Sequence, residues 1–117
     1  MKKIIIIEDD AGIQDSAKLI FKPPDYQVTI FSDGNPILAG KFEVPDIFLI
    51  DKQLPGIDGL DLCRHLKEQD ATRNIPIIIM SASPQANKLA SMANAEGFIE
   101  KPYTIKQMKE LVASVIR

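Results

Sequence analysis

The sequence predicts an α/β fold: a doubly wound parallel sheet of five strands with helices on both faces. Five short apolar runs alternate with segments of helical spacing, a pattern typical of parallel α/β sheets. Three of the runs are nearly continuous in β-branched residues, as expected of strands covered on both faces. The runs are 3–7, 26–31, 46–50, 75–80 and 97–100. Right-handed crossovers make the doubly wound arrangement the economical topology.

The sequence signals for the expected helices differ in strength. The last, over 104–117, is the clearest, because Thr104 and Gln107 form a capping-box pattern and an apolar stripe follows them. Asp58 is the expected N-cap of the third helix, and Pro23-Pro24 stops the first. The segments with weaker helical spacing are 35–42 and 84–94.

Length and composition indicate one cytoplasmic domain over 1–117. The chain is 45% hydrophobic and 26% charged, which allows a buried core and a solvated surface. Its formal charge of −2 gives no general attraction for nucleic acid or for an anionic membrane. The single cysteine, Cys63, excludes an internal disulfide and suits a reducing compartment. The apolar run 4–7 is too short for a secretory signal or a membrane span.

Chemically useful side chains follow four of the five predicted strands. In a doubly wound sheet the reactive crevice lies beyond the carboxyl ends of the strands, so the fold brings these side chains to one edge. Loops favour polar groups in any case, so a single such position carries little weight. The side chains are Glu8, Asp9 and Asp10 after the first strand, Asp51 after the third, Ser81 after the fourth and Lys101 after the fifth.

The combination of groups at this edge indicates phosphoryl chemistry with Mg²⁺. Converging carboxylates repel one another, and a hard divalent cation with oxygen ligands relieves that repulsion. A lysine and a hydroxyl are out of place in a pure metal cage, but with Mg²⁺ they would hold the oxygens of a phosphoryl group. A carboxylate such as Asp51 can act as the nucleophile that receives the group.

The sequence resembles the receiver domain of bacterial two-component response regulators over essentially its whole length. The motifs "IIIIEDD", "DIFLIDKQLPGIDG", "PIIIMSA" and "GFIEKPY" occur in the order found in that family. The resemblance implies the strand order 2-1-3-4-5. It also implies phosphorelay signalling and a protein that catalyses its own phosphotransfer and dephosphorylation without turning over a metabolite.

The resemblance assigns roles position by position. Asp51 matches the phosphoacceptor, Lys101 the invariant lysine, and Ser81 the switch hydroxyl. Pro102 matches the proline that follows the lysine through a cis bond, and Phe98 the switch aromatic, which is often tyrosine. The Mg²⁺ ligands implied are Glu8, usually through water, Asp9, Asp51 and the backbone carbonyl of Gln53.

Three positions near the site are variable in the family or depart from its usual pattern. Gln53 and Ser83 occupy the variable positions that tune the lifetime of the phosphate, and both are polar. Lys52 follows the phosphoacceptor where an apolar residue is common, and adds a cation beside the site.

The expected partners are a sensor histidine kinase or phosphotransfer protein and a downstream effector whose identity is unknown. Direct binding to nucleic acid or membrane is not expected. The chain is expected to be a monomer or a phosphorylation-dependent dimer. The effector would read a surface formed by the fourth helix, the fifth strand and the fifth helix. The alternative function is that of a phosphorylation-independent pseudo-receiver acting as a protein-binding module.

Two other classes of protein share parts of this pattern. Phosphatases of the haloacid dehalogenase type place the nucleophile after the first strand, whereas Asp51 follows the third. Flavodoxin-like proteins need a hydroxyl- or glycine-rich phosphate loop where this chain has the acidic "EDDAG".

His65 is interpreted as an ordinary helix residue and Cys63 as a buried hydrophobe. The run "KEQDATR", residues 67–73, is interpreted as a solvated helix end.

Overall fold

Five parallel strands form the central sheet of the computed structural model, which describes residues 1–116. Their order across the sheet is β2-β1-β3-β6-β7, so the predicted doubly wound topology and the order 2-1-3-4-5 are both confirmed. Each neighbouring pair is parallel. The strands are β1 (Lys2–Ile7), β2 (Tyr26–Phe31), β3 (Ile47–Asp51), β6 (Ile77–Ser81) and β7 (Gly97–Glu100).

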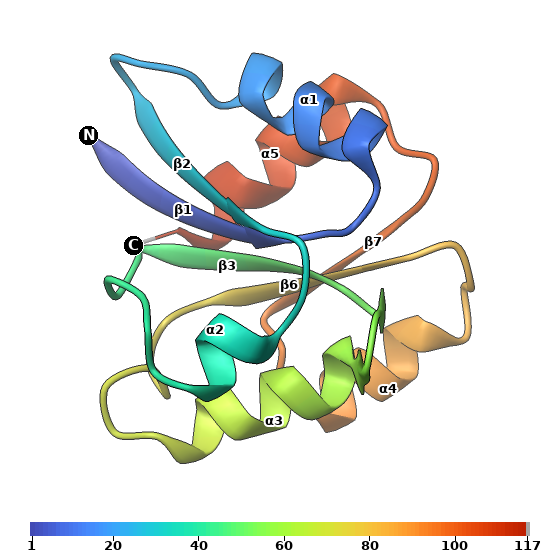
Figure 1. Ribbon diagram of the computed structural model, residues 1–117. Helices are drawn as coiled ribbons and strands as arrows, with labels where there is room; N and C mark the ends of the chain where they lie inside the picture. The colour runs from blue at the N-terminus through green and yellow to red at the C-terminus, as the bar shows by residue number, and fades with distance from the viewer. Residues whose placement is uncertain (117) are drawn as a thin grey trace.

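Helices cover both faces of the sheet (Figure 1). On one face lie α1 (Ala11–Ile20) and α5 (Ile105–Val115). The other face is covered by α2 (Asn35–Leu38), α3 (Gly59–Glu68) and α4 (Ala86–Met92).

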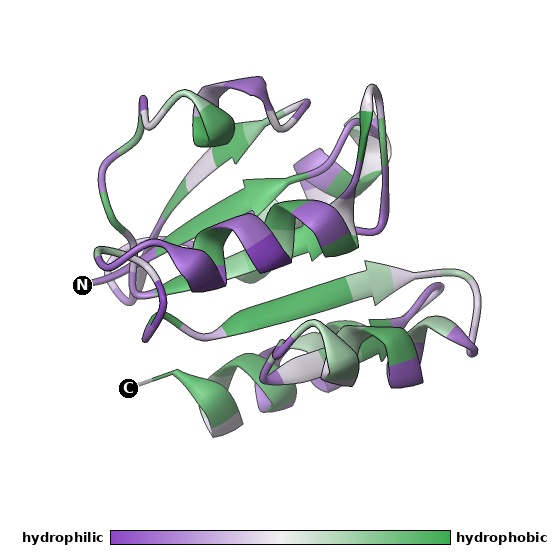
Figure 2. Cartoon of the chain, turned by 90° about the horizontal axis from the view of Figure 1, so that it is seen from below, coloured by the Kyte–Doolittle hydropathy of each residue, from purple (hydrophilic) through white to green (hydrophobic). Residues whose placement is uncertain are grey.

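The sheet is apolar on both faces because successive side chains of a strand point in opposite directions. In β1, Ile5 and Ile7 belong to the core under α2, α3 and α4, whereas Ile4 and Ile6 belong to the core under α1 and α5. In Figure 2 the strands are coloured mostly as hydrophobic, whereas hydrophilic and hydrophobic residues alternate along the helices. The continuous apolar runs of the sequence are therefore strands buried from both sides, as predicted.

The structure adds one detail to the sequence analysis and corrects two others. The turn after Asp51 contains a short antiparallel hairpin of β4 (Gln53–Leu54) and β5 (Ile57–Asp58), with a positive φ of 78° at Gly56. The weak helix expected over 35–42 ends at Leu38, and the chain leaves it through Gly40 at a φ of 71°. Glycine adopts a positive φ at little steric cost. Gly56 can therefore form the turn of the hairpin, and Gly40 can turn the chain away from α2.

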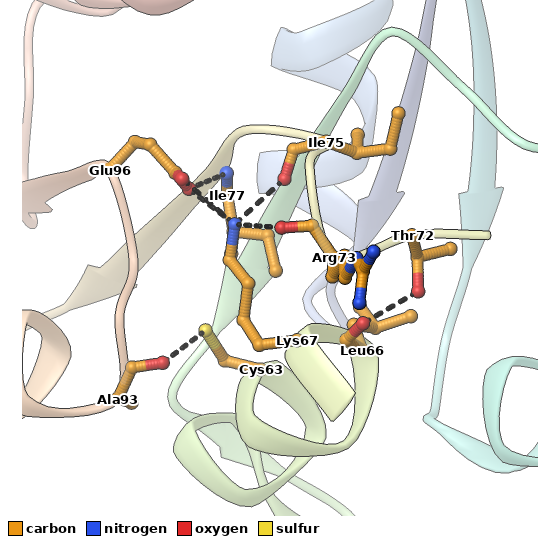
Figure 3. Close-up of polar contacts among 9 residues, drawn as sticks. All are labelled: Cys63, Leu66, Lys67, Thr72, Arg73, Ile75, Ile77, Ala93 and Glu96. Carbon is orange, nitrogen blue, oxygen red and sulfur yellow. Dashed lines mark hydrogen bonds and ion pairs between the residues drawn. The ribbon is translucent and has the colours of Figure 1, made fainter. Parts of the chain in front are cut away.

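The second correction concerns Lys67 near the end of α3, which is largely buried rather than solvated (Figure 3). Its ammonium donates to both carboxylate oxygens of Glu96 at 2.8 Å and to the carbonyls of Ile75 and Arg73 at 3.0 and 3.3 Å. The Glu96 carboxylate also accepts the backbone N–H of Ile77. This network joins the end of α3 to the segment between α4 and β7.

Candidate functional site

Asp51 is the last residue of β3 and lies at the carboxyl edge of the sheet. The apolar run before it is fully buried, and Asp51 itself is only 6% exposed. The chain then turns back, so that the Gly59 N–H donates to the Lys52 carbonyl at 2.7 Å. A Cβ at position 59 would lie 2.1 Å from the Asp51 carbonyl oxygen. Glycine at this position therefore allows the return segment to pack against the backbone of Asp51.

Glu8 and Asp9 follow β1, the strand next to β3. Glu8 is completely buried, and one of its carboxylate oxygens accepts the backbone N–H of Asp10 at 3.2 Å. The side chain of Gln14 in α1 donates to the Glu8 carbonyl at 2.6 Å. Asp9 is exposed. Glu8, Asp9 and Asp51 each offer a carboxylate oxygen, and these oxygens lie within 4.8 Å of one another.

Lys101 extends from the end of β7 into this group of acids. Its ammonium lies 2.6 Å from Glu8 Oε1 and 3.1 Å from Asp51 Oδ1. Its backbone N–H donates to the carbonyl of Ser81 at 2.8 Å, and the bond to Pro102 is cis, as the resemblance implies. One ammonium therefore joins the acids at the carboxyl ends of β1 and β3.

Burial and charge act on the pKa values of this group in opposite directions. Burial raises the pKa of Glu8 above its ordinary value, against the hydrogen bond from Lys101 that lowers it. Burial lowers the pKa of Lys101, but its hydrogen bonds to Glu8 and Asp51 outweigh this effect and raise it. The ammonium is therefore held in its charged form.

The residues at this edge fit a hard divalent cation. Three carboxylates face a single ammonium, which leaves negative charge uncompensated, and all the available donors are oxygens, as Mg²⁺ prefers. A cavity at the surface gives access to the group, lined by the three acids together with Gln53 and Lys101. Glu8, Asp9, Asp51 and Lys101 therefore lie together, as predicted, whereas the side chain of Asp10 accepts the backbone N–H of Ile13 and caps α1.

The remaining residues singled out in the sequence lie around this centre. Ser81 is buried at the end of β6, where its hydroxyl accepts the N–H of Ser83 at 3.1 Å. Ser83 and Gln53 are both exposed. Phe98 is half-buried in β7 and packs against the core under α3 and α4, so it lies among apolar side chains and not among the acids.

Sequence reasoning missed three contacts around the site. Gln14 was not singled out, and neither was the requirement for glycine at position 59. Lys52 was expected as a cation beside the site, and its ammonium forms an ion pair at 2.9 Å with Asp58, the N-cap of α3. His65 lies in α3 and Cys63 is fully buried, in agreement with their interpretation as structural residues.

Comparison with known proteins identifies the family of this chain. Residues 4–113 match the family described as response regulator receiver domain. The chain belongs to this family. Receiver domains are signalling modules of two-component systems that work with histidine kinases, not metabolic enzymes. Membership sets aside the dehalogenase-like and flavodoxin-like alternatives.

Individual relatives resemble this receiver domain in sequence or in fold. The response regulator ArlR of Staphylococcus saprophyticus is 32% identical over 120 residues, which cover all of this chain and 53% of that protein. Chemotaxis response regulator CheY4 of Vibrio cholerae superposes with a TM-score of 0.90 at 20% identity and covers 99% of both chains. The receiver domain of sensor histidine kinase PA1611 from Pseudomonas aeruginosa, which holds a magnesium ion in its active-site cleft, superposes with a TM-score of 0.85 at 22% identity, covering 97% and 95%.

This receiver domain spans about half the length of the curated relatives it matches. Within residues 1–116, no helix combines the length and apolar character required to cross a membrane.

Proposed function

We propose that this receiver domain accepts a phosphoryl group on Asp51 from the phosphohistidine of a sensor histidine kinase or phosphotransfer protein, with Mg²⁺ as cofactor. The observation that carries the proposal is the contact of the Lys101 ammonium with both Glu8 and Asp51 at an edge that also bears Asp9. The magnesium in the cleft of the PA1611 receiver domain supports the choice of cation.

In this reaction a carboxylate oxygen of Asp51 attacks phosphorus. The new P–O bond forms as the P–N bond of the donor histidine breaks, and the electron pair leaves with the imidazole nitrogen, which takes up a proton. Lys101 pairs with charge on the transferred group, because its ammonium already lies 3.1 Å from Asp51 Oδ1. Glu8, Asp9, Asp51 and the Gln53 carbonyl would hold Mg²⁺, which supplies positive charge to the phosphoryl oxygens when bound.

The phosphorylated carboxyl then acts as a switch. A phosphoryl group carries about −1.5 to −2 charge and three strong acceptor oxygens. Ser81 and Lys101 compensate this charge, and movement of Ser81 draws the segment that begins at Ser83 toward the site. Phe98 repacks into the space that this opens, and the surface of α4, β7 and α5 changes for a downstream effector or a second copy of the chain. Gln53 and Ser83 set the lifetime of the phosphate.

The proposal is tested by incubating the protein with Mg²⁺ and acetyl phosphate and measuring intact masses. The wild type is expected to gain one phosphate only when Mg²⁺ is present. Asp51→Asn should gain none, whereas Asp25→Asn, at an exposed position in the loop before β2, should be phosphorylated like the wild type. If the wild type gained no phosphate, the alternative of a phosphorylation-independent binding module would replace this proposal.

A further inference from the structure

Lys52 and Asp58 close the loop that follows Asp51, the proposed phosphoacceptor. The Lys52 ammonium lies 2.9 Å from Asp58 Oδ2, with the two side chains 22% and 38% exposed. The other oxygen of Asp58 accepts the backbone N–H of Leu60 at 2.8 Å, which caps α3. One carboxylate thus joins the residue after Asp51 to the start of the helix.

The residues between this pair follow a fixed path. Gln53 pairs with Asp58 and Leu54 with Ile57 in the β4-β5 hairpin. The base of the loop is held on the other side by the Lys52 N–H, which donates to the Met80 carbonyl of β6 at 2.8 Å. The position of the Gln53 carbonyl therefore depends on contacts to α3 and to β6.

We infer that Lys52 is a positioning residue of the acceptor site: its ion pair with Asp58 holds the Gln53 carbonyl where a bound Mg²⁺ needs it. This inference rests on the proposed function. Lys52 itself pairs with Asp58 and takes no part in binding the cation. Groups that orient metal ligands from outside typically change metal affinity by 10–100-fold when removed.

The direction in which Lys52→Met changes the Mg²⁺ affinity distinguishes a positioning role from a purely electrostatic one. Lys52→Met removes a positive charge near an acidic site, so electrostatics alone predicts tighter Mg²⁺ binding. Loss of positioning predicts weaker binding. Asp58→Asn keeps an acceptor for the Leu60 N–H, since asparagine is also a good N-cap, but weakens the pair with Lys52.

The test is a double-mutant cycle of Lys52→Met and Asp58→Asn, with Mg²⁺ affinity measured by calorimetry and the exchange rate of the Leu60 amide measured by NMR. Lys41→Met, in the exposed loop before β3, is the matched charge control. We expect each single variant to bind Mg²⁺ about tenfold more weakly. The double variant should be no weaker than either single variant, and the control should equal the wild type.

Unchanged or tighter Mg²⁺ binding by Lys52→Met, in a background where the wild type binds, would overturn the inference and leave the proposed function intact. Faster exchange of the Leu60 amide with unchanged Mg²⁺ affinity would overturn it as well, because the pair would then be only structural. If the wild type bound no Mg²⁺, the proposed function would fail first, and this inference with it.

Discussion

Replacing Lys67 with methionine should destabilise the fold far more than is usual for a lysine in the last turn of a helix. Methionine keeps most of the apolar stem but removes the ammonium, which donates to Glu96 and to the carbonyls of Ile75 and Arg73. The Lys67 side chain is 9% exposed and that of Glu96 is 28% exposed. The variant would remove the donor that Lys67 supplies to a partly buried carboxylate and to two carbonyls.

The magnitude follows from the burial of this pair. Breaking a fully buried ion pair costs about 3–5 kcal/mol, whereas an exposed pair contributes about 0–1 kcal/mol. Water can reach part of Glu96, and its carboxylate keeps the N–H of Ile77. We therefore expect Lys67→Met to lower the free energy of unfolding by about 2–3 kcal/mol, which in a domain of this size corresponds to about 8–12 °C in Tm.

The assay is urea unfolding followed by circular dichroism, with the slope of the transition required to match that of the wild type. Lys106→Met is the control, because Lys106 lies 3.9 Å from Glu110 in a pair whose side chains are 83% and 68% exposed. The control should unfold close to the wild-type midpoint. Equal midpoints for Lys67→Met and Lys106→Met would refute the argument that burial gives the Lys67 network its energy.

Three further predictions concern single positions. Gly59→Ala should lower the free energy of unfolding by more than about 2 kcal/mol and weaken Mg²⁺ binding, because its Cβ would lie 2.1 Å from a backbone oxygen. The control is Gly12→Ala, which should cost much less because its Cβ would lie 3.2 Å from a side-chain atom. Urea unfolding measures the stability of both variants, and calorimetry measures their Mg²⁺ affinity. Burial raises the pKa of Cys63 to about 11, so only roughly a thousandth of it is thiolate at pH 8, and iodoacetamide should label it slowly until urea unfolds the chain. Thr104→Ala removes the observed capping box of α5 and should cost about 1 kcal/mol by urea unfolding, whereas Thr104→Ser should restore most of it.

The outcomes that contradict these predictions are specific. Equal stability of the two glycine variants would show that the segment after β5 relaxes around the added methyl group. Labelling of Cys63 at the same rate in native and unfolded protein would show that its burial is transient. Equal unfolding midpoints for Thr104→Ala and the wild type would show that α5 is held by its packing alone.

The strands and the acidic edge could be predicted because they depend on local patterns and one general rule. In runs such as 3–7 and 46–50 every residue after the first is apolar, which predicts buried strands, and the carboxyl ends of parallel strands meet. Glu8 and Asp51 follow two such runs directly, so their convergence needs no knowledge of distances. The predicted convergence was correct because these side chains lie at strand ends.

The contacts that the sequence did not reveal depend on how the chain folds between strands. Lys67 and Glu96 are 29 positions apart, and neither lies in an apolar pattern, so the polar context of Lys67 indicated a solvated position. Lys52 and Asp58 meet only because a hairpin of two-residue strands brings them together. The need for glycine at position 59 arises from a close backbone approach, which has no periodic signature.

The two edges of the sheet differ in how they balance buried charge, and this difference supports the proposed function independently of family membership. At the amino edge, Lys67 pairs with one carboxylate and fills its remaining bonds with carbonyls, so the network is satisfied as it stands. At the carboxyl edge, the ammonium of Lys101 pairs with Glu8 and Asp51, and the carboxylate of Asp9 lies beside these two acids. Glu8 is fully buried, and burial raises its pKa. An arrangement that serves stability alone would balance the second edge like the first. The excess of negative charge is explained if a divalent cation belongs there, and the lysine beside Asp51 is explained if a phosphoryl group follows.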